Sequence, residues 1–137
     1  MILVDTGPLV ALFDPQDAYH RRCAKTLHGI REPIWTTVPV LTEAFHMLRP
    51  DSVGSDRLQD FIDGRGLGVW FLDAPLLTRA FELMERYADH PMDLADASLM
   101  VACEALGTRK VFTVDRSDFA TYRVRRGHRH YPMEILP

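Results

Sequence analysis

Four carboxylic acids stand where short apolar runs end or helical patterns begin, and their chemistry is the clearest in the sequence. Asp5 and Asp115 each follow a short apolar run. Glu43 lies one turn into a helical pattern, and Asp96 lies in the first turn of another. Four like charges in one place repel strongly unless a cation is present or some are protonated. Mg²⁺ and Mn²⁺ prefer oxygen ligands, so the quartet predicts a divalent-metal site suited to cleaving phosphodiester bonds.

Each acid taken alone has a plainer interpretation. Asp5 and Asp115 could begin turns, and Glu43 could face solvent on its helix. Asp93 and Asp96 have the spacing of a helix N-terminus, where acids interact favourably with the helix dipole. Asp96 lies among apolar neighbours, which favours a cleft over an exposed surface. The metal-site prediction therefore depends on the four acids together, each at the expected end of an element.

Four further polar residues accompany the quartet as secondary candidates. Thr6 follows Asp5. Thr113 precedes Asp115 by two residues, so in a strand the side chains of Thr113 and Asp115 point the same way. These hydroxyls could position a water molecule or a phosphate oxygen, or they could reflect only turn and strand preferences. The acids Asp93 and Asp118 lie close to the quartet in sequence.

The elements that must position these residues alternate between short apolar runs and helical patterns. Strands are predicted at residues 2–4, 33–37, 69–72, 110–114 and 133–136, and helices at 8–13, 18–27, 39–48, 56–63, 75–87 and 93–106. This alternation predicts one α/β domain spanning residues 1–137, with three α/β/α layers and a central, mainly parallel sheet of four to five strands. Ligand sites of such sheets lie beyond the carboxyl ends of the strands, where Asp5 and Asp115 are expected.

The composition is that of a globular protein. Apolar residues make up 47% of the chain, which suffices for a core without disulfides. The two cysteines are distant in sequence and are expected to be reduced and buried. The N-terminal segment lacks the basic region of a secretory signal, and no apolar run is long enough to span a membrane. We therefore expect a cytoplasmic protein without a membrane partner.

The net charge of −3 hides a basic segment near the C-terminus. Residues 107–131 contain seven Arg or Lys against two Asp. The arginines expected to contact RNA phosphates are Arg116, Arg123, Arg125, Arg126 and Arg129. A solvated loop or a protein-binding surface is the alternative.

In four ordered pieces the chain resembles the PIN-domain ribonucleases, in particular VapC-type toxins of bacterial toxin–antitoxin pairs. The matching pieces, spread over the whole chain, are residues 4–8 (VDTGP), 41–44 (LTEA), 92–99 (MDLADASL) and 112–119 (FTVDRSDF). The resemblance implies a PIN-like fold in which Asp5, Glu43, Asp96 and Asp115 are the catalytic, metal-binding acids.

The same resemblance implies an Mg²⁺- or Mn²⁺-dependent endoribonuclease that hydrolyses structured RNA, such as tRNA or rRNA. It also implies a homodimer and a VapB-like antitoxin whose C-terminal segment occludes the site. The stretch 49–68 matches nothing specific in the family.

Four other functions fit the sequence less well. Asp5-Thr6-Gly7 spells the aspartic-protease tripeptide, but that fold is all-β and needs a second aspartate. Aspartyl-phosphate phosphatases require a second aspartate at the position of Gly7. Receiver domains require an acidic pair before their phosphorylated aspartate. The remaining alternative is a catalytically silent PIN-like module that binds RNA or acts as a scaffold.

Overall fold

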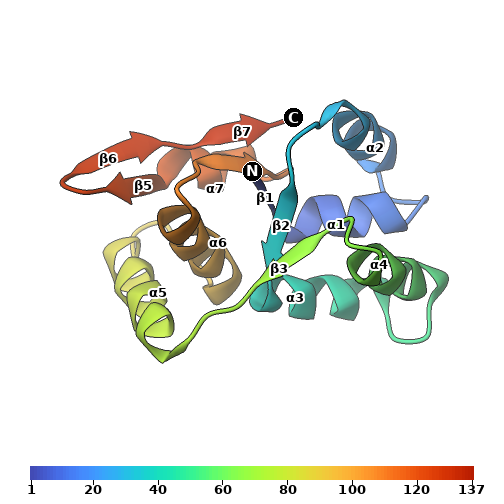
Figure 1. Cartoon of the computed structure of the whole chain (residues 1–137), viewed down its shortest axis with the longest axis horizontal. Helices are drawn as coiled ribbons and strands as arrows, with labels where there is room; N and C mark the ends of the chain where they lie inside the picture. The colour runs from blue at the N-terminus through green and yellow to red at the C-terminus, as the bar shows by residue number, and fades with distance from the viewer.

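A parallel sheet of five strands lies at the centre of the computed structural model, which describes residues 1–137 (Figure 1). The strands are β1 (Ile2–Val4), β2 (Ile34–Thr37), β3 (Gly68–Trp70), β4 (Lys110–Phe112) and β7 (Glu134–Leu136). Their order across the sheet is β3-β2-β1-β4-β7, and every neighbouring pair is parallel. The prediction of a central, mainly parallel sheet of four to five strands is confirmed.

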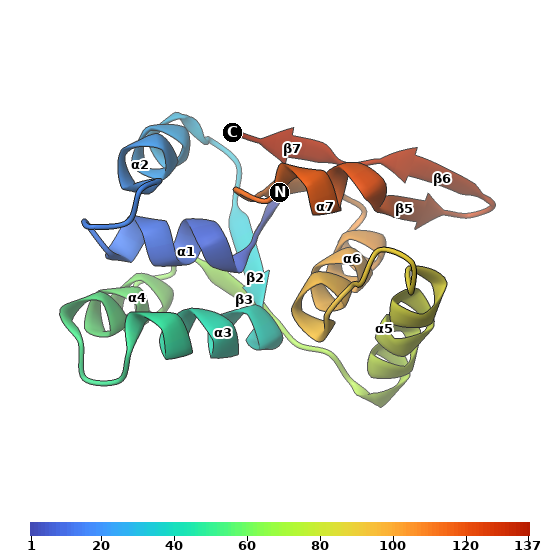
Figure 2. The ribbon, with the colours of Figure 1, turned by 180° about the vertical axis from the view of Figure 1, so that it is seen from behind.

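Helices flank the sheet on both faces, because parallel neighbours need long crossover connections. The helices are α1 (Thr6–Phe13), α2 (His20–Gly29), α3 (Val38–Leu48), α4 (Val53–Asp63), α5 (Ala74–Arg86), α6 (Leu94–Leu106) and α7 (Arg116–Thr121). In Figures 1 and 2, α1 to α4 lie on one side of the sheet and α5 and α6 on the other. The predicted three-layer α/β/α arrangement is therefore present.

The core lies between the sheet and its helices. All three residues of β1 are buried, as a strand covered on both faces requires. Helix α6 is buried over most of its length and contacts both β1 and β2. Cys23 and Cys103 are buried free thiols, as expected. None of the helices combines the length and the apolar composition that a membrane-spanning helix requires.

The basic segment departs from the sequence-based prediction. The sequence predicts no helix or strand between residues 115 and 132, but the structure has helix α7 there and an antiparallel hairpin of β5 (Arg123–Arg126) and β6 (Arg129–Pro132). Gly127 has a φ of +60° at the hairpin turn, where glycine adopts the left-handed conformation without strain. In Figure 1 the hairpin extends past α6 on the side of α5.

Candidate active site

The carboxyl end of β1 delivers Asp5, the most enclosed acid of the quartet. Its side chain is only 8% exposed, and it caps the N-terminus of α1. Oδ1 accepts a hydrogen bond from the Thr6 backbone N–H at 2.8 Å. Oδ2 accepts one from the Thr113 hydroxyl, also at 2.8 Å. Thr113 lies just beyond β4, so two adjacent strands hold this one carboxylate.

The first turn of α6 delivers Asp96. Asp93 caps this helix, because its Oδ1 accepts a hydrogen bond from the Asp96 backbone N–H at 2.8 Å. Two residues further on, the Ser98 hydroxyl lies 2.6 Å from the hydroxyl of Thr37, the last residue of β2. Both hydroxyls are buried, so the start of α6 is fixed against the carboxyl end of the sheet.

Asp5 and Asp96 both lie where ionisation is costly, and the charge of Asp5 adds to the cost for Asp96. Burial raises the pKa of Asp5 to about 6, and the charges of Glu43 and Asp93 contribute. Burial raises the pKa of Asp96 to about 8, with further contributions from Asp93 and Asp5. A buried and a half-buried carboxyl that both resist ionisation mark a site where negative charge is costly and where a cation would be attracted.

Glu43 approaches the same cluster from α3. Its side chain is exposed, yet partial burial and the charge of Asp93 raise its pKa. The Thr6 hydroxyl lies near Glu43 and lowers that pKa, but its oxygen makes no hydrogen bond of normal geometry although it is buried. A buried, unpartnered hydroxyl beside two acids is a polar group available to a water molecule or a ligand.

Asp115 occupies a different environment at the N-terminus of α7. Its Oδ1 accepts hydrogen bonds from the Ser117 hydroxyl at 3.1 Å and from the Asp118 backbone N–H at 3.4 Å. Burial acts to raise its pKa, but these bonds and the Asp118 side chain hold it below its usual value. Its backbone N–H donates to the Thr113 hydroxyl at 3.0 Å. Asp115 is thus joined to Asp5 through Thr113, while its own carboxylate caps α7.

The donor set fits a hard divalent cation by its chemistry. Carboxylates and a hydroxyl are the oxygen ligands that Mg²⁺ and Mn²⁺ prefer. As the side chains are placed, no three acidic, histidine or cysteine groups come close enough to hold a metal ion together. The side chain of Glu43 is exposed, so a change of rotamer could bring its carboxylate toward the other acids.

The five arginines expected to contact RNA have unequal freedom. Three donate to backbone carbonyls: Arg116 to Pro137, Arg123 to residues 120–122, and Arg126 to Gly107. Arg125 lies 3.9 Å from Glu104. Arg129 is exposed and makes no side-chain hydrogen bond or ion pair in this structure, so it has the greatest freedom to contact a ligand.

Two residues beside the acids were missed from the sequence. The Tyr122 hydroxyl donates to Asp96 Oδ2 at 3.0 Å, and His90 Nε2 lies 2.6 Å from Asp118 Oδ1. Burial and the Asp96 charge raise the pKa of Tyr122, so its phenol stays protonated. Tyr122 ends a six-residue helix and His90 lies in the α5–α6 loop, and neither belongs to a recognisable motif. No sequence signal would have found them.

A family model of the PIN domain matches residues 2–124. The chain belongs to the PIN domain family. The match includes all four acids of the quartet and ends inside β5, so most of the basic hairpin lies beyond it.

Among characterised proteins, the chain is similar to Ribonuclease VapC26 of Mycobacterium tuberculosis, strain H37Rv. The two are 24% identical over 125 residues, which cover 89% of this chain and 92% of the relative. Among solved structures, the fold is similar to M. tuberculosis VapC20, a sarcin–ricin-loop-cleaving toxin, with a TM-score of 0.78. The identity is 20%, over 86% of this chain and 92% of VapC20. FitAcB from Neisseria gonorrhoeae has a TM-score of 0.61 at 19% identity, over 87% and 91% of the two chains.

Proposed function

We propose that this PIN domain is a VapC-type endoribonuclease that hydrolyses phosphodiester bonds in structured RNA with Mg²⁺ or Mn²⁺. The observation that carries the proposal is the pair Asp5 and Asp96. Both carboxyls lie at the carboxyl edge of the sheet, and both have a raised pKa because they are buried beside other acids. The family match and the likeness to Ribonuclease VapC26 supply the reaction class.

The proposed metal-binding residues are Asp5, Glu43, Asp96 and Asp115. These residues would hold a divalent cation, which would supply neutralisation of phosphate charge and activation of a water molecule. Thr113 and the Thr6 backbone hold the Asp5 carboxylate, so little rotamer freedom remains to be lost when a ligand binds. The unpartnered Thr6 hydroxyl is placed to donate to a phosphate oxygen or a water.

The test is cleavage of RNA by purified protein with Mg²⁺ or Mn²⁺, beside the variants Asp5→Asn and Asp96→Asn. We expect products with 5′-phosphate and 3′-hydroxyl ends, and loss of cleavage in both variants. Asp89→Asn is the matched control, because Asp89 is an exposed acid without side-chain bonds. Full activity of Asp96→Asn, or 2′,3′-cyclic phosphate ends, would overturn the proposed mechanism. RNA binding without metal-dependent cleavage would favour the silent, RNA-binding module instead.

The substrate is proposed to be a folded RNA of the translation machinery, in the cytoplasm. VapC20, whose fold is similar, is a sarcin–ricin-loop-cleaving toxin. A sarcin–ricin-loop oligonucleotide, total tRNA and rRNA are therefore the first substrates to compare. Cleavage of none of them, with activity on unstructured RNA alone, would contradict the structured-substrate part of the proposal.

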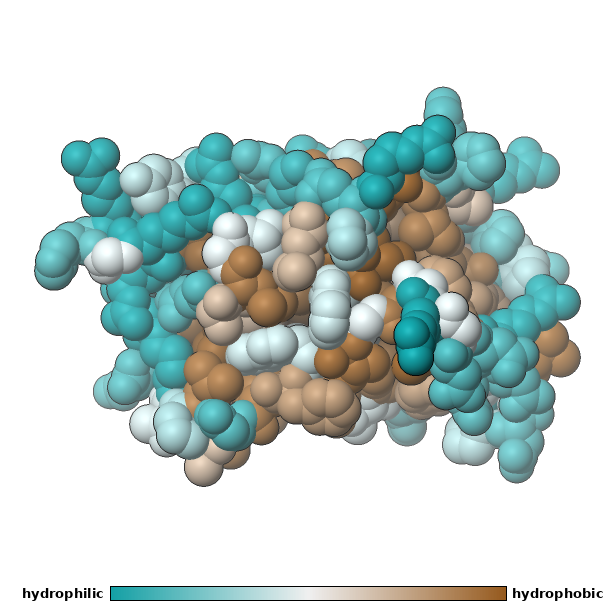
Figure 3. Space-filling model, in the orientation of Figure 1, coloured by the Kyte–Doolittle hydropathy of each residue, from teal (hydrophilic) through white to brown (hydrophobic).

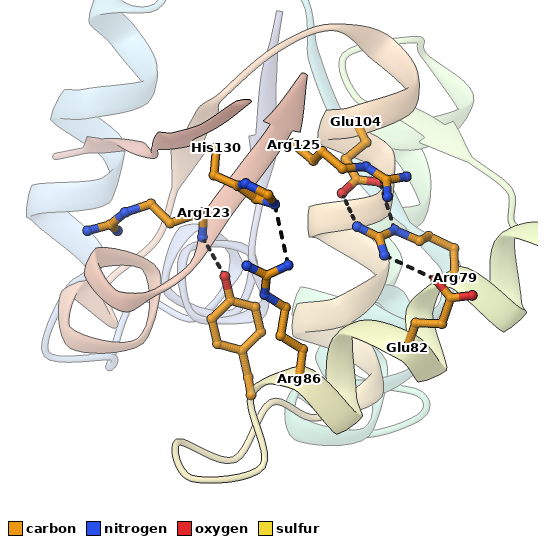
Figure 4. A network of polar contacts seen from close by, with 8 residues as sticks. Arg79, Glu82, Arg86, Glu104, Arg123, Arg125 and His130 are labelled. Atoms are coloured by element: carbon orange, nitrogen blue, oxygen red, sulfur yellow. Dashed lines mark hydrogen bonds and ion pairs between the residues drawn. The ribbon is translucent and has the colours of Figure 1, made fainter. Parts of the chain in front are cut away.

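We propose that the basic hairpin β5–β6 contacts phosphates beside the cut. Its first residue, Arg123, directly follows Tyr122, which donates to Asp96. Figure 4 shows how the hairpin is attached to α5 and α6: Arg125 faces Glu104, which also accepts from Arg79, and Arg86 lies 3.4 Å from His130. The hairpin is therefore held against α5 and α6 and carries its arginines next to the acids.

The salt dependence of RNA binding tests this surface. Each phosphate contact contributes roughly 0.7 to 0.9 to the slope of log K against log salt. In an Asp5→Asn background without metal, Arg125→Ala with Arg129→Ala should lower that slope by about 1 to 2. Arg21→Ala with Arg22→Ala, on the exposed side of α2, should leave it unchanged. An equal slope in both double variants would contradict the phosphate contacts.

A homodimer is proposed through an apolar face at the edge of the sheet. Phe71 is 69% exposed and Phe81 53%, and Phe71 lines a shallow groove with Val38 and Leu77. Figure 3 shows apolar residues gathered across the middle of this side of the molecule. Phe71→Glu should yield monomers in light scattering at micromolar concentration. Val53→Glu is the control, since Val53 is equally exposed at the start of α4; a monomeric wild type would refute the dimer.

A VapB-like antitoxin is the proposed protein partner. Two further structures with a similar fold are FitAB of a FitAB–DNA complex, with a TM-score of 0.63, and Rickettsia felis VapBC2 bound to promoter DNA, with a TM-score of 0.60. Co-purification with the product of an adjacent small gene, and inhibition of RNA cleavage by it, would support the partner. If the small protein binds this chain and RNA cleavage is unchanged, the proposed inhibition is contradicted.

A further inference from the structure

Tyr122 is held in the core with only its hydroxyl directed at the acid cluster. The side chain is fully buried. Its ring meets three others nearly edge-on: Tyr87 at 5.1 Å, Phe119 at 5.3 Å and His90 at 6.0 Å between centroids. A phenol enclosed on these sides has one position for its oxygen, and that position is 3.0 Å from Asp96 Oδ2.

The two carboxylate oxygens of Asp96 differ in their hydrogen bonds. Oδ2 accepts from Tyr122, whereas Oδ1 has no hydrogen-bond partner in the protein. A charged carboxylate that accepts one hydrogen bond from a fixed donor is limited in rotation about its last bond. One oxygen of Asp96 is therefore fixed, and the other is left for a ligand.

The same tyrosine links Asp96 to Asp115 through α7. Asp115 caps the first turn of this helix, and Tyr122 is the residue that ends it. The Tyr122 backbone N–H donates to the Asp118 carbonyl at 3.2 Å, which closes the last turn. Helix α7 therefore connects one acid of the quartet at its start with the side chain that holds another at its end.

We propose that Tyr122 is a positioning residue: its hydroxyl orients the Asp96 carboxylate so that Oδ1 is presented to a bound divalent cation. The inference rests on the proposed function, because it assigns Asp96 to the metal site. Groups that hydrogen-bond to a metal ligand from behind contribute about 10- to 100-fold in metal affinity or activity. Tyr122 itself touches neither metal nor substrate and takes no part in proton transfer.

The variant Tyr122→Phe removes the hydroxyl and keeps the ring. We expect Mn²⁺ to bind about 10- to 100-fold more weakly by isothermal titration calorimetry. Activity at low Mn²⁺ should fall, and kcat should recover as Mn²⁺ is raised to saturation, because the acids themselves remain. The melting temperature in EDTA reports separately on folding and should stay near that of the wild type.

Tyr87→Phe is the matched control. Its hydroxyl belongs to the same aromatic cluster but accepts from the Arg123 backbone N–H at 3.0 Å and touches no acid. Its Mn²⁺ affinity should equal that of the wild type. Unchanged Mn²⁺ affinity in Tyr122→Phe, or an equal loss in Tyr87→Phe, overturns the positioning role and leaves the proposed nuclease intact. A wild type that binds no Mn²⁺ overturns both.

Discussion

Replacement of Asp96 by Asn should stabilise the metal-free protein at alkaline pH. Burial beside Asp93 and Asp5 raises the pKa of Asp96 from 3.8 to about 8. A group whose pKa is raised on folding binds its proton more tightly in the native state, so stability falls as pH rises from about 4 to about 8. The asparagine has no charge to ionise, and the variant escapes that loss.

The size of the effect follows from the shift. About four pKa units at about 1.4 kcal/mol each give a ceiling near 6 kcal/mol. Rearrangement of water and side chains around the ionised carboxylate absorbs part of this, and we expect about 2 kcal/mol at pH 8.5. For a chain of this length, that gain corresponds to roughly 6 °C in melting temperature. At pH 4 the difference should vanish, because Asp96 is then neutral in the folded wild type.

The assay is thermal unfolding in EDTA across pH 4 to 9, followed by the same series with Mn²⁺. A bound cation stabilises the native wild type in proportion to its affinity, so Mn²⁺ should reverse the ranking of the two proteins. Asp89→Asn serves as the control for removal of one negative charge. If Asp96→Asn shows no pH-dependent gain in EDTA, or gains as much as wild type from Mn²⁺, the reasoning about this acid is wrong.

Two further substitutions test how the acids are held. A Cβ at Gly7 would lie 2.5 Å from Cγ2 of Val114, so Gly7→Ala should displace the segment between β4 and α7. We expect a clear loss of nuclease activity with only a small decrease in melting temperature. Activity equal to wild type would show that the segment adjusts without consequence. Thr113→Val removes a donor to Asp5, so the pKa of Asp5 should rise further; Mn²⁺ affinity should fall more at pH 6 than at pH 8. An equal loss at both pH values would contradict this role of Thr113.

The sheet and its acids were predictable because their signals are local. A short apolar run such as residues 2–4, bounded by a turn signal, favours a buried strand, and the acid that follows such a strand is expected at the edge of the sheet. The position of Asp5 therefore follows from the local pattern, and that of Asp96 from its place in the first turn of a helix with apolar neighbours. What the pattern lacks is rotamer information: the sequence leaves open whether the Asp115 carboxylate caps the following turn or faces the other acids, and in the structure it caps α7.

The helix and the hairpin of the basic segment were not predicted, because the apolar residues there are too few to show a period. Helix α7 has six residues, and the Asp-x-Ser-Asp sequence that caps it is equally typical of a turn. In β5 only Val124 is buried, between exposed arginines. The alternation of Arg123, Val124 and Arg125, followed by Gly127, was nevertheless a weak hairpin signal that could have been used.

Three acids near the site also serve as helix caps: Asp5 for α1, Asp93 for α6 and Asp115 for α7. A cap contributes about 1 kcal/mol, and selection for folding alone would retain it after catalysis had been lost. Glu43 and Asp96 cap nothing. Among relatives that have lost nuclease activity and act as scaffolds, Glu43 and Asp96 should be substituted first. These two positions should therefore distinguish active from inactive relatives better than Asp5 does.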